Sequence, residues 1–236
     1  MLGIKEWNLD TIMFTYLWSP FKWFGKKLHF LQSPFVVAAL IFCAVAFLLL
    51  KFVDPAMLES VHQGLPLLLM MLALAVILFS FTYRKSAVKA WLYLLVGHFF
   101  IITAVVFNAV HINTIEIVYY VSGVLLAFFL GYYCLQKIKA IDNDISLTQF
   151  HGYVYEEETT GLLFLFAAIG MLGFPITTAF IGIDVLFTYV HHNQTVLIIL
   201  MALCFIFIEL AAFRILLRIF FGPHKKLSHP VAFRSS

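Results

Sequence analysis

Three ionisable side chains stand inside apolar runs of this chain, and they are the residues best suited to chemistry. They are Asp184, Glu209 and His98. An ionisable group inside a membrane span is costly, and such groups often belong to ion paths or proton relays. Desolvation raises the pKa of a carboxyl group, while histidine titrates near neutral pH without help. The three residues therefore predict a path that takes up and releases protons.

Each of these residues also has a purely structural interpretation. A protonated Glu209 can hydrogen-bond to a neighbouring helix, since no Lys or Arg lies three or four residues away from it. A single histidine such as His98 can join two helices in the same way. Lys89 stands near the end of an apolar run, where it either extends to the membrane surface or contributes to the path. Asp184 is the strongest candidate, because a predicted helix break lies just before it.

That break follows from residues that disfavour a continuous helix. Pro175 has no backbone N–H, and its ring clashes with the preceding turn. Gly173 and Gly182 loosen the same stretch, while Thr177 and Thr178 offer hydroxyls to the freed carbonyls. In lipid, such a break persists only where protein buries it or where it lines a wet cavity. Broken helices beside charges mark ion paths in transporters, although a proline kink that only shapes packing is the alternative.

The composition describes the environment of these residues. The 236 residues are 63% hydrophobic and 11% charged, with a mean hydropathy of +1.00, which excludes an ordinary soluble globular protein. The net charge of +3 is small and scattered, so we expect no nucleic-acid partner. The sequence has no phosphate-binding glycine loop, no nucleophile beside a base and no metal-spaced His/Cys set. We therefore expect no catalytic residues, no metal and no cofactor.

The apolar runs predict an all-α membrane protein with about six membrane-spanning helices. Several runs reach the roughly 20 residues that cross a bilayer. The fifth span is too long for one straight crossing, which agrees with a discontinuous helix. The predicted spans are Phe35–Phe52, Gly64–Thr82, Val88–Asn108, Ile115–Cys134, Gly161–Val190 and Val196–Phe221.

Basic residues predict the orientation of these spans. Lys and Arg occur in every second connection, and the alternate connections contain neither. The positive-inside rule then places both termini in the cytoplasm, and we expect the chain in the plasma (inner) membrane. Three regions follow: an interfacial segment over 1–34, a transmembrane domain over 35–223 and a cytoplasmic tail over 224–236. In the first, aromatic residues at helical spacing with lysines off their face predict an amphipathic helix that lies in the interface.

Two further patterns concern contacts with other helices or proteins. Gly123, Ala127 and Gly131 recur every four residues, and such a stripe lets another helix approach closely. The longest connection, 136–160, carries three consecutive glutamates, Glu156 to Glu158. This acidic run is either a solvated loop or a seat for a basic surface of a partner.

The last third of the chain resembles a known superfamily. The resemblance rests on Gly173-Phe174-Pro175, Ala179-Phe180, Asp184, Arg214 and Phe221-Gly222. This order is similar to the later part of the antiporter-like, proton-conducting subunits shared by respiratory complex I and the multisubunit Na⁺/H⁺ antiporters. The residues around Pro175 are most similar to membrane subunits of two-component inorganic-carbon (bicarbonate/CO₂) uptake systems. The first four spans match only in spacing and hydropathy.

The resemblance implies a subunit that conducts protons or Na⁺ at a discontinuous helix. Family members usually have two inverted repeats, whereas this chain has room for about one. We therefore expect another membrane subunit that supplies the missing repeat, and a large cytoplasmic partner protein. Ile183 stands where the family usually has Lys or Glu, and Glu209 has no recognised counterpart. Either the relay is rebuilt around Asp184 and Glu209, or conduction is lost.

Two functions from different classes follow. The first is a membrane subunit of an ion-coupled transport complex that energises inorganic-carbon uptake, or its redox-linked version in a proton pump. The second is a non-conducting scaffold that anchors a cytoplasmic catalytic partner. Only the first requires the carboxyl groups of Asp184 and Glu209.

Overall fold

The computed structural model describes residues 64–109, 113–175, 177–191 and 193–222, with the isolated positions 19, 23, 27, 33, 38, 41, 42 and 45. These residues are helical apart from their connections and include no strand, so the all-α prediction is confirmed for them. Apart from those isolated positions, the interfacial segment 1–34, the span Phe35–Phe52 and the tail 224–236 lie outside the described residues. The helices are α4 (Leu65–Thr82), α5 (Ala87–Asn108), α6 (Thr114–Ile141), the 3-10 helix η6 (Tyr153–Tyr155), α7 (Glu158–Met171), α8 (Thr178–Thr188) and α9 (Thr195–Ile219).

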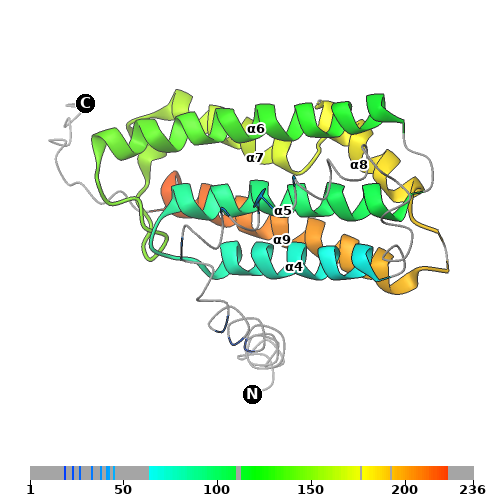
Figure 1. Ribbon diagram of the computed structural model, residues 1–236. Helices are drawn as coiled ribbons and strands as arrows, with labels where there is room; N and C mark the ends of the chain where they lie inside the picture. The colour runs from blue at the N-terminus through cyan, green and yellow to red at the C-terminus, as the bar shows by residue number, and fades with distance from the viewer. Residues whose placement is uncertain are drawn as a thin grey trace, which may run out of the picture.

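The helices lie side by side in an up-and-down bundle (Figure 1). α5 is central and contacts α4, α6 and α9, while α6 contacts both α7 and α8. Burial follows this order: 89% of the most apolar window of α5 is buried, against 39% for α9 and 33% for α6. The bundle therefore has one enclosed helix and a broad outer surface on α6 and α9.

Four of the described helices are long and apolar enough to cross a membrane, namely α4, α5, α6 and α9. α7 and α8 are apolar but shorter. The observed bounds lie close to the predicted spans, except at the end of α6. That helix continues to Ile141, past the predicted end at Cys134. Lys137 and Lys139 therefore extend the helix and do not open the connection.

Sequence signals explain where the helices begin and how they join. Pro66 occupies the first turn of α4, where its missing N–H has no helical partner to lose. The Asn113 side chain caps α6 by accepting a hydrogen bond from the Ile115 N–H at 3.1 Å. The Ser80 hydroxyl donates to the Ala90 carbonyl at 2.7 Å and joins α4 to α5. Local sequence thus explains where α4 and α6 begin, and a side-chain hydrogen bond joins α4 to α5.

The chain leaves helical geometry between α7 and α8. Gly173 has φ +68°, a conformation that glycine adopts without strain. The Thr177 hydroxyl donates to the Phe174 carbonyl at 2.9 Å, which satisfies one group that the interruption frees. Phe174 and Pro175 are exposed at the surface of the bundle. The interruption is therefore an outer feature of this chain.

Small residues set the distance between α6 and its neighbours. A Cβ atom on Gly123 would lie 2.3 Å from the backbone nitrogen of Ala179 in α8. A Cβ atom on Gly182 would lie 2.5 Å from the Cα of Tyr120 in α6, and one on Gly131 would lie 2.5 Å from the Trp91 ring of α5. Ala127 packs against Gly170 of α7 in the same way. The stripe on α6 lies where these helices make their closest contacts.

Candidate functional site

Asp184 and Glu209 both lie on the outer surface of the bundle. Asp184 is in α8 and Glu209 is in α9, and both side chains are exposed. Neither has a hydrogen-bond or ion-pair partner within the part of the chain that the structure describes. Their immediate neighbours on this surface, Ile181, Ile206 and Leu210, are exposed apolar residues. Two carboxyl groups thus stand alone on an apolar face.

The two carboxyl groups also lie at the same level of the bundle. The rings of Phe187 in α8 and Phe205 in α9 are in contact, with centroids 5.8 Å apart. Asp184 precedes Phe187 by about one helical turn, and Glu209 follows Phe205 by about one turn. Because α8 and α9 run in opposite directions (Figure 1), both acids lie one turn from this contact toward the same end. The fold therefore brings the two acids to one level of the bundle. The sequence alone predicted only that they lie in different spans.

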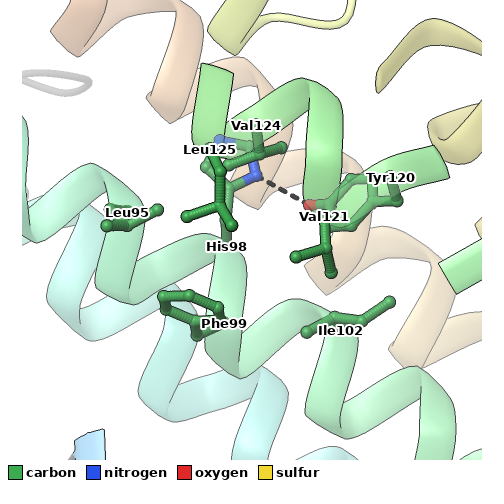
Figure 2. Close-up of a pocket in the computed structure, with 8 residues that line it drawn as sticks. All are labelled: Leu95, His98, Phe99, Ile102, Tyr120, Val121, Val124 and Leu125. Carbon is green, nitrogen blue, oxygen red and sulfur yellow. Dashed lines mark hydrogen bonds between the residues drawn. The ribbon is translucent and has the colours of Figure 1, made fainter. Parts of the chain in front are cut away.

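His98 lies on the inner side of the same aromatic contact. Its side chain in α5 is 1% exposed, and its ring centroid is 6.4 Å from that of Phe205. Nδ1 of His98 is 2.7 Å from the hydroxyl of Tyr120 in α6 (Figure 2). Nε2 has no partner among the described residues. Phe205 thus contacts both the buried imidazole and Phe187 of the helix that carries Asp184.

The His98–Tyr120 pair borders a small hollow between α5 and α6. The hollow has a volume of ≈ 10 Å³ and is lined otherwise by apolar side chains of these two helices (Figure 2). That volume is at the lower limit for one water molecule. The hydrogen bond admits two proton arrangements, because either Tyr120 donates to Nδ1 or Nδ1 donates to Tyr120. The pair can therefore hold a proton in alternative positions without moving its heavy atoms.

The remaining predicted residues separate into two groups. Lys89 is exposed in the first turn of α5, at the end of the bundle where α9 terminates, and the structure places no carboxylate against it within the described residues. Gly173, Pro175 and Thr177 form the interruption before α8, and Thr178 begins that helix. Gly182 lies one turn after Thr178 and packs against Tyr120. The interruption thus directly precedes the helix that carries Asp184, whereas Lys89 lies at the beginning of α5.

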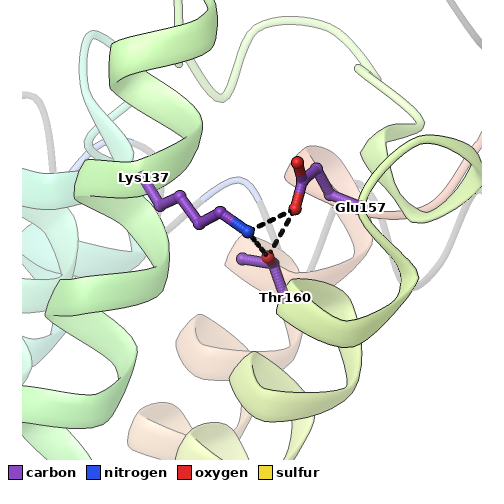
Figure 3. Close-up of polar contacts among 3 residues, drawn as sticks. All are labelled: Lys137, Glu157 and Thr160. Atoms are coloured by element: carbon purple, nitrogen blue, oxygen red, sulfur yellow. Dashed lines mark hydrogen bonds and ion pairs between the residues drawn. The ribbon is translucent and has the colours of Figure 1, made fainter.

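The connection between α6 and α7 is organised by polar contacts at the bundle end. Nζ of Lys137 lies 2.6 Å from Oε2 of Glu157 and 3.0 Å from the Thr160 hydroxyl (Figure 3). The hydrogen bond from Lys137 is the main reason that the pKa of Glu157 is lowered. The Tyr153 hydroxyl donates to Asp142 at 2.6 Å, and burial, followed by this hydrogen bond, raises the pKa of Tyr153. Asp142 and Glu157 of the acidic connection therefore have structural partners.

Sequence reasoning missed a second polar cluster, at the opposite end of the bundle. The side-chain amides of Asn108 and Gln194 exchange hydrogen bonds of 2.9 and 2.8 Å. Asn108 also donates to the Tyr189 carbonyl at 3.0 Å, and the Tyr189 hydroxyl donates to Glu116. These contacts join the ends of α5 and α8 to the beginnings of α6 and α9. The signal available was a set of polar residues flanking two of the three connections that lack Lys and Arg, 109–114 and 191–195.

The chemistry that this arrangement allows is proton or cation transfer. Carboxyl, imidazole and phenol groups are present at one level of the bundle, and all of them can exchange protons. No group of three His, Cys, Asp or Glu side chains converges among the residues with described positions. Cys134 and Cys204 are buried and unpaired with each other. The site has the groups of a relay, arranged from a buried imidazole to an exposed pair of carboxyls.

Comparison with protein-family models, with curated proteins and with solved structures finds no match to this chain.

Proposed function

We propose that this chain is a membrane-embedded subunit of an ion-coupled transport complex, and that Asp184 and Glu209 carry protons (or Na⁺) along the contact with a second membrane subunit. The observation that carries the proposal is the pair of carboxyl groups at one level of an exposed apolar face. In a bilayer, an ionisable group that faces lipid is costly. A second subunit that covers this face would remove the cost and enclose a polar path.

The interruption before α8 supports the same conclusion. Backbone groups freed by a broken helix are tolerated in a bilayer only against protein or a wet cavity. Phe174 and Pro175 are exposed, close in sequence to Asp184. Together α7 and α8 would form one discontinuous crossing alongside α6, which makes six crossings with the span Phe35–Phe52. A covering subunit would then enclose the break and the carboxyls together.

His98 supplies the inner end of the proposed path. It adjoins Phe205, whose ring also touches Phe187 on the acid-bearing side. Rotation of the Phe205 side chain would open a route between the imidazole and the carboxyl groups. On the resemblance around Pro175, we extend the proposal to a complex that drives inorganic-carbon uptake, with a large cytoplasmic partner and with both termini of this chain in the cytoplasm.

Proton flux in membrane vesicles that contain the assembled complex tests the proposal. Asp184→Asn and Glu209→Gln remove the proton-binding group with little change in shape. Each should lower flux by about a hundredfold, the usual scale for loss of a proton-transferring side chain, while the complex still co-purifies. Asp144→Asn is the matched control, because it makes the same change in an exposed residue of the α6–α7 connection. Undiminished flux in both carboxyl variants would overturn the proposal.

A scaffold that anchors a cytoplasmic catalytic partner is the second candidate. It is favoured by the well-defined α6–α7 connection, where Tyr155 is 69% exposed beside the acidic run. An exposed aromatic residue among acids suits a basic protein surface. If the chain is a scaffold, charge reversal at Glu156 and Glu158 should release the cytoplasmic partner. The conduction proposal predicts instead that proton flux through the membrane subunits is unchanged in these variants. Partner release without any effect of the Asp184 and Glu209 variants would favour the scaffold.

A further inference from the structure

Arg214 contacts the end of a neighbouring helix and does not extend freely into solvent. One of its terminal nitrogens donates a hydrogen bond to the Phe81 carbonyl oxygen near the end of α4. Its guanidinium carbon also lies 5.5 Å from the centre of the Phe81 ring. A guanidinium has five N–H donors, so these contacts leave most of them unused. These contacts fix the Arg214 side chain at the bundle end and leave several of its N–H groups able to donate further hydrogen bonds.

The charges around Arg214 have the same sign as its own. Arg84, three residues after Phe81, and Arg218, one turn further along α9, both act repulsively on it. Within the described residues, no carboxylate forms an ion pair with any of these three arginines. A partly buried charge needs a compensating charge or strong hydrogen bonds. The cluster of Arg84, Arg214 and Arg218, here called the arginine cluster, therefore has no anionic partner among the described residues.

Aromatic rings contact two residues of the arginine cluster, and exposed apolar residues lie beside it on α9. The Arg218 guanidinium lies 4.3 Å from the centre of the Phe150 ring, and Phe150 is itself exposed. Leu217 and Phe221 are exposed at the same end of α9. A small hydrated anion gains nothing from such neighbours. A ligand that joins a phosphate to hydrocarbon chains can contact both the charges and the apolar surface.

We propose that the arginine cluster binds the phosphate of an anionic membrane phospholipid, whose acyl chains lie along the exposed end of α9. The cluster lies at the bundle end where the basic connections are found, and the positive-inside rule assigns that end to the cytoplasmic leaflet. Anionic lipids attract Arg and Lys at that surface, and basic pockets between helices bind their headgroups. This site is distinct from the face that carries Asp184 and Glu209, so it does not depend on which ion the complex moves.

Native mass spectrometry of this chain purified from membranes, with any subunit that remains bound, and reconstituted with phosphatidylglycerol or with phosphatidylcholine, tests this site. Phosphatidylglycerol should remain bound after phosphatidylcholine has dissociated. Arg84→Gln and Arg218→Gln should each lower its retention by about fivefold, the effect expected for one cation near a lipid headgroup. Both variants keep the Arg214–Phe81 contact, so the fold is expected to survive. Lys139→Gln is the control, because it removes one positive charge from an exposed position at the same end, on α6.

Three results would overturn the lipid assignment. Equal retention in wild type, the two arginine variants and Lys139→Gln would show that the basic end attracts lipid without a defined site. Displacement of phosphatidylglycerol by added inorganic phosphate at similar concentration would show that the cluster is a site for the free ion. Loss of an acidic protein subunit from the arginine variants, with lipid retained, would assign the cluster to a protein contact.

Discussion

α5 and the α8–α9 pair place their ionisable residues in opposite surroundings. His98 of α5 is buried and hydrogen-bonded to Tyr120 inside the bundle. Asp184 and Glu209 are exposed and have no partner among the residues that the structure describes. The helices themselves differ in the same way, because 89% of the most apolar stretch of α5 is buried, against 39% of that of α9. One side of the bundle holds its polar group in a buried hydrogen bond, whereas the other leaves two carboxyl groups without a partner among the described residues.

This difference separates two roles that a polar residue can have in an apolar helix. A buried histidine with a phenol partner is compatible with a chain that is complete by itself. Carboxyl groups without a partner on an apolar face are costly in a bilayer, because lipid offers them neither water nor counter-ions. The proposed function accounts for this cost by placing a second membrane subunit over the acid-bearing face.

Disrupting the packing of α8 on α6, which holds the acid-bearing helix on the bundle, should have the largest effect. In Gly123→Leu, the added Cβ alone would lie 2.3 Å from the backbone nitrogen of Ala179, and the rest of the leucine side chain would also need space. Backbone atoms cannot move aside cheaply, so we expect a loss of about 3 kcal/mol or more in stability. Thermal unfolding in mild detergent should show a much lower Tm or failure to assemble.

The control for this prediction is Gly161→Ala. An added Cβ there meets the Phe220 ring at an ordinary 3.4 Å, and alanine favours the helix. Its Tm should equal or exceed that of wild type. Similar Tm values for Gly123→Leu and Gly161→Ala would contradict the observed packing of α8 on α6.

Removing the Tyr120 hydroxyl should lower the stability of the bundle interior by a moderate amount. Tyr120→Phe leaves both ring nitrogens of His98 buried without a protein partner, at a cost of about 1–3 kcal/mol. Tyr133→Phe removes the same atom from an exposed position on α6 and should change the Tm little. If Tyr120→Phe is as stable as Tyr133→Phe, the His98–Tyr120 hydrogen bond contributes nothing to the interior.

The smallest expected effect concerns the polar connection outside the apolar spans. The pKa of Glu157 is lowered in the folded protein, chiefly by Lys137. Its stabilisation is therefore present above the ordinary glutamate pKa of about 4.3 and is lost as the pH falls through the lowered value. Because the pair is partly exposed, the change in Tm should stay below about 2 °C. Glu157→Gln should abolish this pH dependence, and an unchanged acid transition in that variant would contradict the assignment.

The bounds of the helices could be predicted from the sequence better than which side of each helix is buried. Hydropathy placed α4, α5 and α9 to within a few residues, because each is a long apolar run. It ended α6 too early, since Lys137 and Lys139 lower the hydropathy without ending the helix. The pairing of His98 with Tyr120 and the exposure of Glu209 depend on how each helix is rotated. All-round apolar helices carry little periodic signal for that rotation, so these features required the three-dimensional structure.

The most direct test of the account is photo-crosslinking from the acid-bearing face in native membranes. A photoreactive amino acid would replace Ile181 of α8 or Leu210 of α9, both exposed beside the carboxyl groups. Leu126 of α6, which is 70% exposed, is the comparison position. The account predicts a discrete protein adduct from Ile181 and from Leu210, with a membrane protein identified in it. Lipid adducts alone from both positions would contradict the claim that a second subunit covers Asp184 and Glu209.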